Sequence, residues 1–73
     1  MVVFGIKCQR TAVLDAKPDY YKSGNCEFTS IISYAKFFQA RSSAENKMYV
    51  LQQGYKNCPD LVFSIAEIEI KEL

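Results

Sequence analysis

Few residues in this sequence could do chemistry, and their spacing argues against a catalytic site. The chain has no histidine, which removes Ser–His and Cys–His nucleophile pairs and the commonest acid–base group at neutral pH. Its three cysteines, at positions 8, 26 and 58, include no C-x-x-C pair of the kind that binds zinc. The three glycines stand apart, so there is no glycine-rich phosphate loop. We therefore predict that the protein is not an enzyme and has no metal or cofactor site.

Two remaining features could still be reactive. Glu67 and Glu69 are two residues apart, so in a strand both carboxylates lie on one face. Such a pair can do acid–base work, but on an open strand face we interpret it as solvated charge. Cys58 precedes Pro59 and could be an exposed thiol, although we favour a small buried one.

Length and charge restrict the class of protein. The 73 residues, of which 49% are hydrophobic and 23% charged, predict one globular domain over residues 1–73. A net charge of +1 argues against a strongly basic nucleic-acid binder. The first residues resemble no signal peptide, and no apolar run is long enough to span a bilayer. We expect a cytoplasmic protein with reduced cysteines and no membrane contact.

A helix over residues 43–53 is the element that the sequence marks most clearly. Ser42 stands three residues before Glu45, the spacing of a capping box that satisfies free N–H groups. Ala44, Met48 and Leu51 then form one apolar stripe. Gly54 is placed to end the helix in a Schellman motif, with Tyr55 closing over the last turn.

Along the chain, two predicted strands precede this helix and a third follows it. Residues 2–8 alternate apolar and polar, as do residues 26–41 and 62–71. Residues 15–25, with Pro18 and Gly24, break the first two strands apart as a long loop. The helical spacing of Ile31, Tyr34 and Phe38 leaves residues 29–40 open as a second helix.

The order of elements gives an α+β fold of the form β-β-α-β. Strands one and two pair antiparallel, and the helix returns the chain so that strand three lies on the free side of strand one. The prediction is a three-stranded sheet in the order 2-1-3, with one helix packed on one face.

Two surfaces are candidates for binding a partner. The sheet face away from the helix would present Phe37, Phe63 and Ile65, and large apolar groups on an uncovered face suggest an interaction surface. The loop that holds Lys17, Tyr20, Tyr21 and Lys22 is the second candidate, because tyrosines are enriched at binding hot spots. Packing of those tyrosines onto the domain, to anchor the loop, is the structural alternative.

The C-terminal half also resembles a class of known proteins. Residues 37–45 (FFQARSSAE), Gly54 and residues 68–73 (IEIKEL) resemble the strand–helix–strand unit of short phage and prophage accessory proteins, among them some anti-CRISPR inhibitors. The resemblance implies a stoichiometric inhibitor that occludes a host protein surface, for example that of a defence complex, and it carries over no catalytic residues.

These observations lead to one functional hypothesis and two alternatives. We expect a small non-enzymatic protein-binding module of this inhibitor-like kind. A nucleic-acid-binding protein that uses the lysines and tyrosines of residues 17–22, with Lys7 and Arg41, is the first alternative. A structural homodimer, in which two open sheet faces pack together, is the second.

Overall fold

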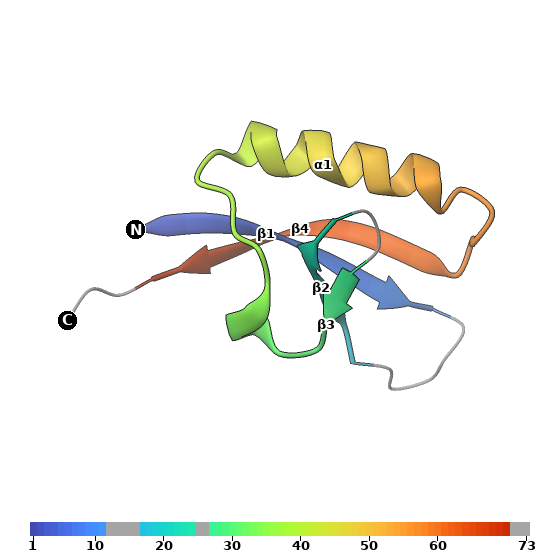
Figure 1. Ribbon diagram of the computed structural model, residues 1–73, viewed down its shortest axis with the longest axis horizontal. Helices are drawn as coiled ribbons and strands as arrows, with labels where there is room; N and C mark the ends of the chain where they lie inside the picture. The colour runs from blue at the N-terminus through green and yellow to red at the C-terminus, as the bar shows by residue number, and fades with distance from the viewer. Residues whose placement is uncertain (12–16, 25–26, 71–73) are drawn as a thin grey trace.

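The computed structural model describes residues 1–11, 17–24 and 27–70. Its elements are β1 (Val2–Arg10), β2 (Asp19–Ser23), β3 (Glu27–Thr29), the 3-10 helix η1 (Ile32–Tyr34), α1 (Arg41–Gly54) and β4 (Leu61–Glu69). The strands form one antiparallel sheet in the order β3-β2-β1-β4. Helix α1 packs against β1 and β4 and covers one face of the sheet (Figure 1). The α+β class is therefore confirmed.

The prediction of three strands is wrong, because the sheet has four. β4 pairs with β1 along nine residues, antiparallel and on the side away from β2, as expected. The segment predicted as a loop over residues 15–25 instead contains β2, while its residues 15–16 and 25 lie outside the described part.

Residues 27–41, the described part of the predicted strand over 26–41, form neither that strand nor the alternative helix over 29–40. Among these residues, Glu27–Thr29 is the one strand. The hydroxyl of Thr29 then accepts a hydrogen bond from the N–H of Ile31, and the chain turns into η1. Such local bonding of a side chain to the backbone competes with the sheet ladder, so the strand ends.

Helix α1 is correctly located, but both predicted caps are wrong. It begins at Arg41, with Ala40 as N-cap and no side-chain cap, so Ser42 lies inside the first turn. Glu45 accepts a hydrogen bond of 2.8 Å from Arg41 Nε instead of completing a capping box. Gly54 belongs to the helix and is not a left-handed residue. The predicted stripe is confirmed, since Ala44 and Leu51 are buried and the third member packs against the core.

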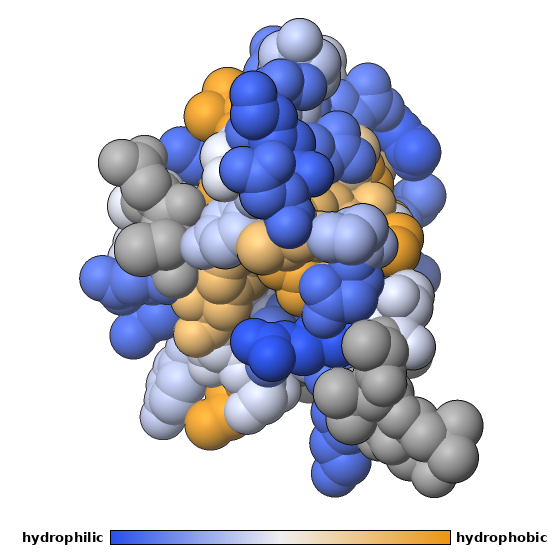
Figure 2. Space-filling model, turned by 90° about the vertical axis from the view of Figure 1, so that its right-hand side faces the viewer, coloured by the Kyte–Doolittle hydropathy of each residue, from blue (hydrophilic) through white to orange (hydrophobic). Residues whose placement is uncertain are grey.

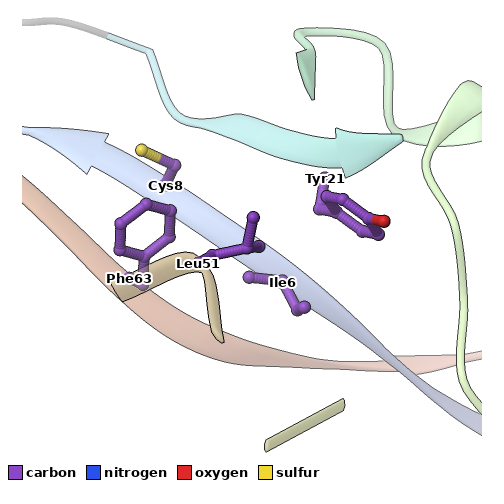
Figure 3. Packing of buried hydrophobic residues seen from close by; sticks show 5 residues of the cluster. All are labelled: Ile6, Cys8, Tyr21, Leu51 and Phe63. Carbon is purple, nitrogen blue, oxygen red and sulfur yellow. The ribbon is translucent and has the colours of Figure 1, made fainter. Parts of the chain in front are cut away.

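The core lies between α1 and one face of the sheet. Ile6 and Cys8 of β1 face Leu51 of α1, with Phe63 and Tyr21 beside them (Figure 3). Alternation along β1 explains this arrangement, because its even-numbered residues share the face that the helix covers.

The register of β4 corrects the sequence-based assignment of its faces. Phe63 pairs with Cys8 and Ile65 with Ile6, and directly opposed residues point to the same side of a sheet. Both therefore face the helix and not the open side, and Phe63 is only 8% exposed. Val62, Ala66 and Ile68 occupy the other face.

Candidate functional site

The sheet face opposite α1, here called the open face, gathers several of the predicted binding residues. Cross-strand pairing places Val3, Gly5 and Lys7 of β1 on this face, together with the even-numbered residues of β4. Val3 and Gly5 are nevertheless buried, so the exposed part of the face lies around them. Phe63 and Ile65 are absent from it for the reason given above. The open face is therefore built from other β4 residues than the sequence suggested.

Phe37 does lie on the open face. The backbone of Phe38 exchanges two hydrogen bonds, of 2.7 and 2.8 Å, with that of Phe4, which turns Phe38 toward the core. Its neighbour Phe37 points the other way, and its ring lies 3.6 Å from the position that a Cβ on Gly5 would take, beside Ile68. The ring thus packs over the glycine as part of the open face.

The two tyrosines of β2 are divided between the two faces. Tyr20 pairs with Lys7 and so lies on the open face. The exposed Lys22 stands at an irregularity in the pairing of β2 with β3, where alternation does not assign it to a face. Tyr21 points into the core, where it is 3% exposed and its hydroxyl donates a 2.6 Å hydrogen bond to the carbonyl of Gly24. For Tyr21 the structure therefore shows the alternative arrangement, in which the ring packs onto the domain. Lys17 is exposed, just before the strand.

Exposed apolar side chains extend the open face. The 3-10 helix η1 lies on the side of the sheet away from α1 (Figure 1), and it brings Ile32 and Tyr34, with Ile31 before it, all exposed. Met1 and Ile70 are also exposed and bond to each other across the end of the sheet. Apolar groups gathered in this way are typical of an interaction surface.

The charges on the open face are few and of both signs. Lys7 of β1 stands on it, and so does the exposed Glu27 of β3, because its neighbour Phe28 pairs with Tyr21 on the core side. Glu67 and Glu69 lie on the helix side. The open face is consequently mainly apolar, with mixed charge at its edges.

Two cavities open at the end of the molecule where α1 finishes. Their volumes are about 280 and 290 Å³, and they share Tyr55 and Leu61 as lining residues. Figure 2 looks at this end and shows apolar groups between the hydrophilic end of α1 and the hydrophilic groups below. One cavity adds charged groups, Arg10 and Asp19, to the Cys8 thiol. Both cavities offer room for a side chain of a partner.

Sequence reasoning missed the aromatic cluster behind these cavities. Phe28 contacts Tyr21, Tyr55 and Phe63, with each pair of ring centroids 6.2 Å apart. Edge and tilted ring pairs of this kind stabilise a core beyond their buried area. The rings come from four separate segments, so no local spacing could have indicated that they meet.

The two described cysteines should differ sharply in reactivity. Burial raises the pKa of the Cys8 thiol above its ordinary value of 9.0, and the nearby charge of Asp19 adds to the rise. Cys58 is exposed, contrary to our preference for a buried thiol; Cys26 lies outside the described residues. Since the thiolate is the reactive form, we expect iodoacetamide at neutral pH to alkylate Cys58 well before Cys8. Peptide mass spectrometry over time would measure both rates, and equal rates in the folded protein would contradict the burial of Cys8.

Neither the geometry nor comparison with known proteins indicates a further chemistry. Among the described residues, no group of three or more potential ligands lies close enough to hold a metal ion. None of the helices in that part of the chain has the length and apolar character needed to cross a membrane. Comparison with protein families, curated proteins and solved structures finds no match.

Proposed function

We propose that the protein is a non-enzymatic binding module that docks its open face on another protein. The observation that supports this proposal is that Phe37 and Tyr20 lie on one face together with the exposed apolar residues in and before η1. Because the face is mainly apolar, the partner that fits it is a protein surface that is itself largely apolar. That the protein acts in the cytoplasm as an inhibitor, like the phage proteins, remains a separate prediction. The proposed binding does not depend on it.

The same face favours a protein over a nucleic acid as its partner. Binding of single strands uses aromatic rings for stacking, and Tyr21 is withdrawn into the core. The remaining lysines, Lys7, Lys17 and Lys22, are few for binding a phosphate backbone. The exposed Ile31, Ile32 and Val62 have no role in such binding.

The test compares exposed residues on the two sides of the molecule. Tagged protein would be used to capture partners from lysate after nuclease treatment, and the affinity for any captured protein would then be measured with purified components. Ile32→Ser and Tyr20→Ser alter the open face, while Val50→Ser removes a comparably exposed apolar group from α1. We expect each open-face variant to weaken binding about tenfold, as loss of an interface anchor does, and the control to change it less than about twofold.

Three results would overturn the proposal. Binding that Val50→Ser weakens as much as Ile32→Ser would place the contact elsewhere. Capture that disappears with nuclease, or affinity that falls steeply with salt, would identify a nucleic-acid partner. Retention of full affinity by both open-face variants would exclude this surface.

A further inference from the structure

The outer edge of β4 carries backbone groups that no other described residue satisfies. Met1 and Ile70 exchange both backbone hydrogen bonds, of 2.7 and 3.1 Å, and so form a hydrogen-bonded pair. From this pair onward, non-hydrogen-bonded and hydrogen-bonded pairs alternate along β1 and β4. The N–H and C=O groups of Phe63, Ile65 and Glu67 must then point away from β1. β4 is an edge strand of the sheet. Within the described ranges, no hydrogen bond from the N–H or C=O groups of these three residues is found.

A polar stripe of α1 runs beside this free edge. Lys47 lies over the ring of Tyr21, on the β2 side of the helix, whereas Gln52 lines a cavity with the first residues of β4. Helical spacing extends the β4 side of α1 to Arg41, Glu45, Tyr49 and, beyond the helix end, Lys56. At its middle is Tyr49, 62% exposed, a large ring with nothing to cover it in one copy.

We propose that a second copy of the chain pairs with this edge, antiparallel, about a two-fold axis at Ile65. Ile65 is the midpoint of β4, so this register uses the whole strand. The free groups of Ile65 then bond to Ile65 of the second copy, and those of Phe63 bond to its Glu67. The two sheets become one continuous sheet, a closed and isologous arrangement.

Helix spacing fits this arrangement. Strands in a sheet lie about 4.8 Å apart, and α1 sits over β1 and β4. The two helices would therefore stand two strand spacings apart, about 10 Å, which is the distance at which helices pack. Each Tyr49 would meet its equivalent and lose its exposure.

Charge complementarity also favours a second copy of the chain as the partner at this edge. Glu67 and Glu69 lie at one end of β4, and Lys56 lines the cavity at the other end. Antiparallel pairing brings the acidic end of each copy beside the lysine of the other. The two-fold axis keeps both open faces on one side of the sheet, so the dimer would present two copies of the proposed binding surface.

Sedimentation across a wide concentration range tests the association. We expect a monomer–dimer equilibrium in which Tyr49→Ser lowers the dimer affinity about tenfold. Val50→Ser is the control, because Val50 is 56% exposed on the far side of α1, and it should change the dimer affinity by less than about twofold. Glu67→Lys and Lys56→Glu should each weaken it about fivefold, and together restore it. Ile32→Ser should leave it unchanged, which separates this proposal from binding through the open face.

Amide exchange supplies a residue-level readout. In the dimer, the N–H groups of Ile65 and Glu67 are protected, and protection rises with protein concentration; the alternate residues Ser64 and Ala66 are protected by β1 at every concentration. A protein that stays monomeric throughout would overturn the proposal. So would a dimer in which Ile65 and Glu67 exchange rapidly, or one that Ile32→Ser disrupts and Tyr49→Ser does not.

Discussion

Replacement of Phe63 by alanine is expected to lower the free energy of unfolding by about 3–5 kcal/mol, as for other buried aromatic residues. The ring packs between Tyr55, 5.9 Å away between centroids, and Phe28. Its removal leaves a cavity that the surrounding strands cannot close. Urea denaturation followed by circular dichroism would measure the loss, with the midpoint falling and the slope unchanged.

Val62 is the control for this measurement. It precedes Phe63 but lies on the opposite face and is 48% exposed, so Val62→Ala should cost less than about 0.5 kcal/mol. The reverse order, with Val62→Ala the more damaging variant, would show that β4 is shifted by one residue, which exchanges its two faces.

Replacement of Tyr21 by alanine should have the second large effect, about 3–5 kcal/mol. The variant loses the ring contact with Phe28 and the cation–π contact of 5.4 Å with Lys47. It also loses the bond from its hydroxyl to Gly24. Tyr21→Phe keeps the ring and should cost only about 1 kcal/mol, the usual net value of one hydrogen bond.

The adjacent Tyr20 provides the comparison. It is only partly buried, on the open face, so Tyr20→Ala should change stability by less than about 1 kcal/mol. Thermal unfolding of the two alanine variants would separate the roles of these neighbours. Equal losses of stability would contradict the assignment of the tyrosines to opposite faces.

The sequence predicts those elements in which one pattern dominates. Ile6 and Cys8 of β1 and the apolar stripe of α1 were correctly assigned to the core. Val3 and Gly5, on the other face of β1, are buried as well, which the alternation did not indicate. The antiparallel pairing of β4 with β1 followed from the connection through the helix.

β4 shows why the rest could not be predicted. Leu61, Phe63 and Ile65 alternate with Val62, Ala66 and Ile68, so both faces of the strand are apolar. Alternation cannot choose between them, and only packing against the helix decides which set is buried. The same difficulty affects residues 26–41, where apolar spacing persists although the chain leaves the sheet at Thr29.

The candidate surface was predicted in its parts but not as a whole. Tyr20 and Phe37 were assigned to two separate surfaces, because residues 15–25 were expected to be a loop. Pairing of Tyr20 with Lys7 depends on contacts distant in the chain, which no local pattern reports. The free edge of β4 likewise appears only when the order of the strands is known.

The meeting of Met1 and Ile70 has a mechanical consequence. These residues bond to each other at one end of the β1–β4 ladder, although they are separated by almost the whole chain. A force that pulls them apart acts along the hydrogen bonds, which lie perpendicular to antiparallel strands, and it loads one pair at a time. The hydrogen-bonded pairs would therefore break one after another from that end. The force needed to separate the two strands would be low even if the thermal stability of the protein is high.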